Sequence, residues 1–310
     1  MAKRINETEF VIFDVETTGL GPESGDRIVE IAARRLKGKQ RLGTFNSLVN
    51  LEGGEISPAA FAVNQITPEM LKGAPPIDQV LPGFLDFISG SCLAAYNAPF
   101  DIGFLCSELK LIKRELPARF EVIDILTMAK QLLSHLGRHA LWFVAESLEI
   151  NNIQQHRALS DVDLTVEVFH QLNSILTKKG ITDFEQLFGL FGLNSQLLDD
   201  INSTKIARIQ QALDSRVTLK IRYLSRHNAK VTEREIIPQA VIKGKQQVYP
   251  ALPAAKQNIK GDISQGVYLR GFCNLRREER MFRIENILNL EMGAPFKTRP
   301  GKDSPAAGIA

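Results

Sequence analysis

The feature that most constrains this chain is an apolar run, Phe10-Val11-Ile12-Phe13, which ends in two acids separated by one residue, Asp14 and Glu16. A short continuous apolar run predicts a strand buried on both faces. Side chains two apart on a strand point to the same side, so both carboxylates leave the strand together. Such a pair is costly to bury unless a cation neutralises it, and hard oxygen ligands suit Mg²⁺ or Mn²⁺. Two solvated carboxylates at a strand end would explain this pair equally well if it stood alone.

Two further acids stand at comparable places in the chain. Asp101 follows a second apolar run at 92–97 and lies near the start of a helix, where a capping aspartate is the ordinary explanation. Asp161 lies near the N-terminus of a helix predicted over 161–176, and His156 precedes it in a loop. A histidine with an unperturbed pKa near 6.5 can accept a proton from a metal-bound water at neutral pH.

The order of the predicted elements favours one sheet for all of these residues. Three strands come first and strands alternate with helices later, which predicts an α/β sheet with helices on its faces. Open sheets gather their ligands beyond the carboxyl ends of the strands. Four carboxylates and a histidine at such an edge would suit two metal ions acting on a phosphodiester.

Three motifs carry a family resemblance. They read Asp14-Val15-Glu16-Thr17-Thr18-Gly19-Leu20, Asn97-Ala98-x-Phe100-Asp101-x-x-Phe104-Leu105 and His156-x-Ala158-Leu159-x-Asp161. Together they resemble the motifs of the DEDDh exonucleases, a family that includes the proofreading ε subunit of bacterial DNA polymerase III. The resemblance spans about residues 8–176. It implies an RNase H-like fold, with a mixed sheet flanked by helices, and the release of nucleoside 5′-monophosphates from a 3′ end.

The same resemblance implies roles for individual residues. Asp14, Glu16 and Asp161 would hold the metal that carries the attacking water. Asp14 would bridge to a second metal, supported by Asp101, with His156 as general base. Both metals would be Mg²⁺ or Mn²⁺.

A substrate-binding set follows from the same motifs. Thr17, Gly19 and Leu20 match the turn that receives the terminal nucleotide, and Asn97 belongs to the same expected set. Tyr96 stands where the family commonly has a histidine, and this departure removes no metal-binding position.

The second half of the chain differs in charge and in pattern. Residues 1–203 carry 18 Lys and Arg against 26 Asp and Glu, a balance of −8, whereas 204–293 carry 17 against 8, a balance of +9. The basic half suits a polyanionic partner, although a solvated basic surface would look the same. A leading helix at 204–213 and short strands at 217–224, 233–241, 247–250, 266–272 and 281–287 predict a small β-barrel or sandwich.

This second half also carries a resemblance, looser than the first. The segments Ile221-Arg222-Tyr223, Arg234-Glu235-Ile236-Ile237-Pro238 and Val267-Tyr268-Leu269-Arg270-Gly271-Phe272-Cys273 resemble a WYL domain, as does the segment at 280–284. Val267 departs from the first letter of the naming tripeptide. The resemblance implies a mostly-β, Sm-like barrel that binds single-stranded nucleic acid or a nucleotide. The expected ligand-binding residues are Arg222, Arg234, Tyr268, Arg270, Arg280 and Arg283.

These patterns predict four segments: an exonuclease domain over 1–178, a helical connector over 179–203, a WYL-like domain over 204–293 and a disordered tail over 294–310. Residues 186–191 are similar to peptides that dock on bacterial sliding clamps, with one residue too many, so an amphipathic connector helix is the simpler interpretation. No apolar run approaches the roughly 20 residues of a membrane span. Three scattered cysteines favour reduced thiols in a bacterial cytoplasm.

The function that these predictions favour is a 3′→5′ exonuclease acting on DNA, single-stranded rather than duplex, with the basic domain capturing or sensing the strand. Two alternatives stay open. An RNA-trimming exoribonuclease would use the same metal site, because only contacts at the 2′-OH separate the two sugars. A scaffold that binds nucleic acid without cutting it is disfavoured, because all five catalytic positions are filled.

Overall fold

The computed structural model describes residues 3–51, 53–116, 120–151, 157–193, 196–244 and 266–296. The chain divides into two compact units, Met1–Leu198 and Asp199–Ala310. Each unit has its own five-stranded sheet and its own hydrophobic core. No helix among the described residues is both long enough and apolar enough to cross a bilayer.

A mixed sheet forms the centre of the first unit, with β1 as its middle strand. β1 runs antiparallel to β2 and parallel to β4, so the predicted mixed sheet is confirmed. The sheet has the order β3-β2-β1-β4-β5. Its strands are β1 (Glu9–Thr17), β2 (Ile28–Lys37), β3 (Gln40–Leu48), β4 (Cys92–Ala95) and β5 (Val122–Asp124).

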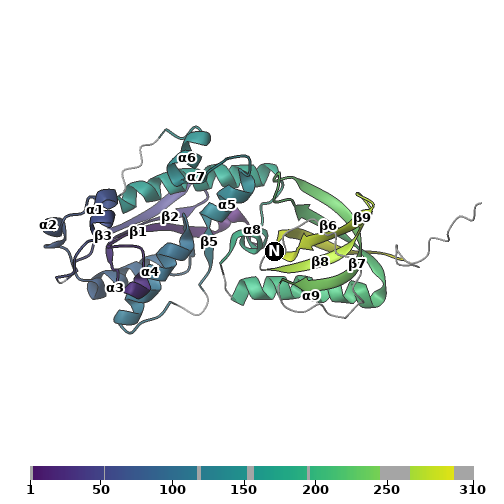
Figure 1. Cartoon of the computed structure of the whole chain (residues 1–310), viewed down its shortest axis with the longest axis horizontal. Coiled ribbons are helices and arrows are strands. Elements are labelled where there is room, and N and C mark those ends of the chain that lie inside the picture. The colour runs from purple at the N-terminus through teal and green to yellow at the C-terminus, as the bar shows by residue number, and fades with distance from the viewer. Residues whose placement is uncertain are drawn as a thin grey trace, which may run out of the picture. The chain divides into compact units, whose positions relative to one another are not determined.

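Helices cover both faces of this sheet, with α3 and α4 on one face and α7 on the other (Figure 1). Alternation along β1 assigns each side chain to a face. Val11 and Phe13 belong to the core beneath α3 and α4, whereas the ring of Phe10 packs 5.1 Å from that of Phe169 on α7. Asp14 and Glu16 have the parity of Phe10 and therefore lie on the α7 side. The helices are α1 (Pro58–Asn64), α2 (Pro68–Leu71), α3 (Ile77–Ile88), α4 (Ala98–Leu111), α5 (Ile125–Leu132), α6 (Leu141–Ser147), α7 (Ala158–Lys178) and α8 (Phe184–Phe191).

The segment expected to be a connector contains α8, which packs into the first unit against α5 and β5. Phe184 stacks on Phe188 at 5.8 Å, and the side chains of Phe188 and Phe191 are buried. This burial contradicts the interpretation of residues 186–191 as a docking peptide for a sliding clamp. The apolar stripe that resembles such a peptide is instead part of the core, because α5 and β5 supply the apolar surface that covers it.

The second unit is mostly β, with one long helix, α9 (Gln196–Ser215), packed on an antiparallel sheet. The sheet has the order β10-β6-β7-β8-β9. Ile209 and Ala212 of α9 join the core formed by the inner faces of the strands. The described residues show a mostly-β unit, and its identity as an Sm-like barrel or a WYL domain stays a prediction. Its strands are β6 (Val217–Leu224), β7 (Val231–Lys243), β8 (Val267–Cys273), β9 (Glu278–Arg283) and β10 (Ile287–Pro295).

The end of this unit differs from the sequence prediction. The strand expected at 247–250 lies outside the described residues. β10 extends to Pro295, into the segment expected to be a tail. Gly293 lies against Thr218 of β6 so closely that a Cβ would overlap its hydroxyl. A glycine at this position therefore permits a close approach of two strands.

The packing of α8 yields a prediction for stability. Phe188→Ala should lower the free energy of unfolding by about 3–5 kcal/mol, because it removes a buried ring and leaves a cavity. The control is Leu111→Ala on α4, whose side chain is 58% exposed and should cost less than about 1 kcal/mol. Urea unfolding followed by circular dichroism measures both. An unchanged midpoint for Phe188→Ala would mean that residues 179–203 form a loose connector after all.

Candidate metal centre and active site

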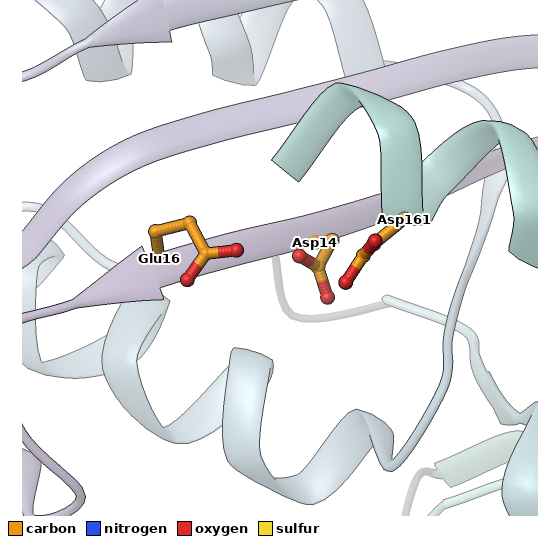
Figure 2. Close-up of side chains that lie close together, drawn as sticks. All are labelled: Asp14, Glu16 and Asp161. Carbon is orange, nitrogen blue, oxygen red and sulfur yellow. The ribbon is translucent and has the colours of Figure 1, made fainter. Parts of the chain in front are cut away.

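Three of the predicted metal ligands meet at the end of β1. Asp14 and Glu16 project from the strand, and Asp161 comes from the first turn of α7 (Figure 2). One carboxylate oxygen from each lies within 4.8 Å of the other two. Side chains far apart in the sequence are thus brought within the span of a single cation.

Asp101 lies beside this cluster but has a different partner. It is buried on the first turn of α4, and its Oδ1 accepts the backbone N–H of Val15 at 3.2 Å. The N-cap of α4 is Asn97, in the left-handed region at φ 72°, so Asp101 is not the helix cap. Asp101 therefore ties α4 to β1 between the two acids of the strand.

The carboxyl groups of the site hold their protons unusually tightly. Burial raises the pKa of Asp14 well above its ordinary value, and the charges of Asp101 and Glu16 raise it further. Burial together with the charge of Asp161 raises the pKa of Glu16 to about 8. Burial also raises the pKa of Asp101 to about 8, although the N–H of Val15 acts in the opposite direction.

The donor set fits a divalent cation. Asp14, Glu16 and Asp161 offer hard oxygen ligands, which is the chemistry that Mg²⁺ and Mn²⁺ take. A bound cation would reverse the raised pKa values, because carboxylates must be deprotonated to ligate a metal.

A tight turn follows β1. The hydroxyl of Thr17 donates to the carbonyl of Gly19 at 2.6 Å, and that of Thr18 donates to Asp26 at 3.1 Å. A Cβ at Gly19 would overlap the Asp26 carboxylate, which bonds to Thr18 and to the N–H of Gly21, so a larger residue there would displace Asp26. Leu20 at the tip is 85% exposed. Thr17 and Gly19 thus shape the turn, and Leu20 is free to contact a ligand, while its role in substrate binding stays a prediction.

The sequence predictions missed α1, which is attached to this turn. Asn64 is buried and its Nδ2 donates to the carbonyl of Thr17 at 3.2 Å. Phe61 and Val63 on the same helix leave large apolar side chains exposed. Together with Leu20 they put apolar surface beside the turn that follows the acids.

The residues before α7 include one predicted site residue, His156, and one that was not predicted, Arg157. His156 lies outside the described residues, so its position is not defined. Arg157, the next residue, forms a bidentate ion pair with Glu30 on β2. Sequence analysis missed Glu30, although a lone acid in the apolar run Ile28-Val29-Glu30-Ile31 is a signal that could have identified it.

The arginines predicted to bind a ligand in the second unit do not share one face. Cross-strand register places Tyr268 opposite Arg283, and Arg270 follows two residues along β8 on the same face. Arg234 instead lies on the core side, with its guanidinium 5.7 Å from the centre of the Phe282 ring. Of the remaining two, Arg280 lies opposite Gly271 on β8, and Arg222 lies on β6 opposite Glu233.

A cluster around Tyr223 was not expected. Burial raises the pKa of Tyr223, while an N–H bond from Arg283 and the charges of Arg226, Arg234 and Arg283 act against that rise. One acid, Glu285, pairs with Arg283 at 2.5 Å. The charges of three arginines, from β7, β9 and the turn after β6, therefore all act on one phenol.

The raised pKa values predict a dependence of stability on pH in the metal-free protein. Between about pH 4.5 and pH 8 the folded state holds protons on Glu16 and Asp101 that the unfolded state has lost, so stability falls as pH rises through this window. In EDTA we expect Tm to fall by roughly 5 °C from pH 6 to pH 8.5. Mg²⁺ should recover most of that loss at pH 8.5.

Differential scanning calorimetry of wild type and Glu16→Gln tests this. The variant should show a shallower pH dependence because it lacks one of the titrating groups. Equal slopes for the two proteins would contradict the assignment.

Comparison with known proteins identifies the family to which the first unit is similar. The family model described as "Exonuclease" (RNase T) matches residues 11–169, about half of the chain. DNA polymerase III PolC-type from Caldanaerobacter subterraneus is 37% identical over 181 residues, which is 58% of this chain and 13% of that protein. A DNA polymerase III subunit epsilon-like protein from Rhodobacter capsulatus is 34% identical over 203 residues, which is 64% of this chain and 28% of that protein. The chain thus spans less than a third of the length of either relative.

A solved structure supports the fold alone. Exonuclease I of E. coli, in complex with a dA16 oligonucleotide, superposes with a TM-score of 0.53 at 14% identity, over 77% of this chain and 53% of that one. Exonucleases of this kind generally use divalent metal ions, which agrees with the three carboxylates at the end of β1. The family match covers β1, which carries Asp14 and Glu16, together with α4 and most of α7, and the chain belongs to the RNase T exonuclease family.

Proposed function

We propose that this protein is a 3′→5′ exonuclease that hydrolyses DNA, single-stranded rather than duplex, with two Mg²⁺ or Mn²⁺ ions. The observation that carries the proposal is the convergence of Asp14, Glu16 and Asp161 within 4.8 Å. DNA is favoured over RNA because the two relatives of the first unit are named as DNA polymerase III proteins.

The chain's own residues would divide the work as follows. Asp14, Glu16 and Asp161 would hold the metal, and Asp101 would keep β1 and α4 in place through its bond to Val15 while lending its charge to the second metal site. Bound metal would supply an activated water and stabilise the leaving oxygen. His156 would accept a proton from the attacking water, which the ordinary pKa of an imidazole allows near neutral pH. Leu20 would contact the terminal nucleotide, with Asn97 near it at the start of α4.

The direct test follows degradation of 5′-labelled single-stranded DNA, duplex DNA and RNA. Wild type should produce a ladder that shortens from the 3′ end, fastest on single-stranded DNA. Asp14→Asn should lose activity at least 10³-fold and bind Mn²⁺ weakly, because it removes a ligand. His156→Gln should lose activity 10²–10⁴-fold while it still binds Mn²⁺, because it removes only the base.

Three other outcomes would each contradict one part of the proposal. RNA as the fastest substrate would make the protein an exoribonuclease. Products that shorten from the 5′ end would overturn the proposed polarity. DNA binding without cleavage under either metal would indicate a scaffold.

We also propose that the basic second unit binds the nucleic-acid strand. Residues 204–293 carry a balance of +9, while the unit that holds the acids is negative and would repel its own substrate. Arg226, Arg234 and Arg283, whose charges all act on Tyr223, offer the positive charge that the phosphates of a single strand bind. A WYL domain, if this unit is one, would use the same surface for a strand or a nucleotide.

Salt dependence tests the role of the second unit. Removing one arginine that neutralises a phosphate should reduce the slope of log K against log salt by about 0.7 for a single strand. Arg226→Gln and Arg283→Gln should each show this reduction, and Arg208→Gln on the exposed side of α9 serves as the control. Fluorescence anisotropy of an oligonucleotide in EDTA, on the Asp14→Asn background, measures binding without cleavage. Slopes equal to that of the control would show that these arginines do not bind phosphate.

A further inference from the structure

Two buried glutamates of the first unit bind their partners in the same way. Glu30 accepts Nε and Nη2 of Arg157 at 2.9 and 2.8 Å and the backbone N–H of Ala158 at 3.2 Å. Glu108 accepts Nε and Nη2 of Arg27 at 2.8 and 2.9 Å and the backbone N–H of Ile28 at 3.0 Å. Each carboxylate thus holds an arginine side chain together with the amide of the next residue. We call each arrangement a clamp: the first is Glu30 with Arg157, and the second is Glu108 with Arg27. Both glutamate side chains are 2% exposed.

The first of these clamps joins β2 to the start of α7. Ala158 is the first residue of α7, and the helix has no side-chain cap of its own, because its N-cap position is Arg157. Glu30 takes over the capping from a neighbouring strand. The turn that it anchors is the turn that carries Asp161.

The second clamp joins α4 to the start of β2. Glu108 belongs to α4, the helix that carries Asp101, and Ile28 is the first residue of β2. Ile28 lies opposite Thr17, where β1 ends. β2 is therefore tied to both helices that bring acids to the site, while it pairs along its length with the strand that carries Asp14 and Glu16.

The first clamp is also close to the acids. Glu30 lies directly opposite Glu16 in the β1–β2 pair, and the charge of Glu30 contributes to the raised pKa of Glu16. Neither Glu30 nor Glu108 belongs to the three-carboxylate cluster. A buried ion pair adds little net stability over apolar packing, whereas bidentate bonds fix both distance and direction. This geometry is therefore better suited to fixing the position of a helix than to adding stability to the fold.

We propose that Glu30 with Arg157, and Glu108 with Arg27, are positioning residues that set where α7 and α4 present their acids to the metal. The proposal rests on the proposed function in one respect, the identification of Asp14, Glu16 and Asp161 as metal ligands. The clamps act on the protein whether or not a metal is bound, so they have a consequence in the metal-free state as well.

Arg157 could act on the metal site through its charge or by positioning α7, and these two roles predict opposite effects of its removal on the affinity for Mn²⁺. Removing a cation beside a cluster of carboxylates should by itself strengthen the binding of Mn²⁺. Removing a clamp should weaken it, and substitutions of groups that orient metal ligands typically cost 10–100-fold in affinity. Arg157→Lys separates the two further, because lysine keeps the charge and loses the bidentate geometry.

The experiment compares the full chain carrying Arg157→Gln, Arg157→Lys or Arg27→Gln with wild type. The matched control is Arg35→Gln on β2, which breaks a 2.7 Å ion pair to Glu9 on β1 without touching α7 or α4. Calorimetry with Mn²⁺ should show affinity about 10–100-fold weaker for the three clamp variants and within twofold of wild type for the control. Tighter or unchanged Mn²⁺ binding by Arg157→Gln would overturn the proposal.

Amide hydrogen exchange on the metal-free protein provides a second readout. Arg157→Gln and Arg157→Lys should speed exchange at Ala158, which bonds to Glu30, and at Asp161, which bonds to the carbonyl of Arg157, while the control leaves both unchanged. Unchanged exchange would overturn the proposal with or without metal. If wild type itself binds no Mn²⁺ while the exchange result holds, the metal-site assignment fails and the clamp stands. Arg157→Lys is the milder change and keeps the test decisive if Arg157→Gln unfolds.

Discussion

Mutual repulsion among carboxylates at the end of β1 is the constraint on which the rest of the first unit depends. Asp14, Glu16 and Asp161 present oxygens within 4.8 Å of one another, and Asp101 lies close enough to raise the pKa of Asp14. Left alone, such groups separate or hold their protons. The surrounding structure therefore has to hold them together until a cation makes the arrangement favourable.

The structure meets this constraint with bonds from elements that are distant in the sequence. The two helices that carry Asp101 and Asp161 both start without a side-chain cap of their own. Asp124 of β5 accepts the N–H of Ala98 at the start of α4, and Glu30 of β2 accepts that of Ala158 at the start of α7. An acidic side chain in this position interacts favourably with the positive end of the helix dipole. It also accepts a hydrogen bond from an amide that has no partner within the helix. The sheet thus sets the position of both helices, which links the stability of the fold to the geometry of the site.

Much of the fold and of the site could be predicted because the signals are local. The apolar run before Asp14 indicated a buried strand, and the spacing of Asp14 and Glu16 placed both on one side of it. Two features of the packing could not be predicted, because they depend on contacts between distant parts of the chain. The stripe in residues 184–191 is the same whether a helix docks on its own chain or on a partner, so burial by α5 and β5 could not be predicted from it. The extension of β10 to Pro295 could not be predicted either, because β6, the strand with which it pairs, is far away in the sequence.

The sequence by itself determined that Asp14 and Glu16 leave one side of a strand and that Asp161 lies near the start of a helix, because a strand's alternation and a helix's first turn are set by neighbours along the chain. It also determined that the two halves differ in charge, −8 against +9, because this needs no folding at all. Only the tertiary structure decided that the three acids lie within 4.8 Å of one another and that buried Glu30 and Glu108 bind the start of α7 and the start of β2. It also decided that the charges of three arginines act on Tyr223. These are contacts between side chains that are distant in sequence and that meet only once the sheet and its helices have packed. A bidentate bond leaves no periodic pattern in a sequence, since it depends on a single pair of residues.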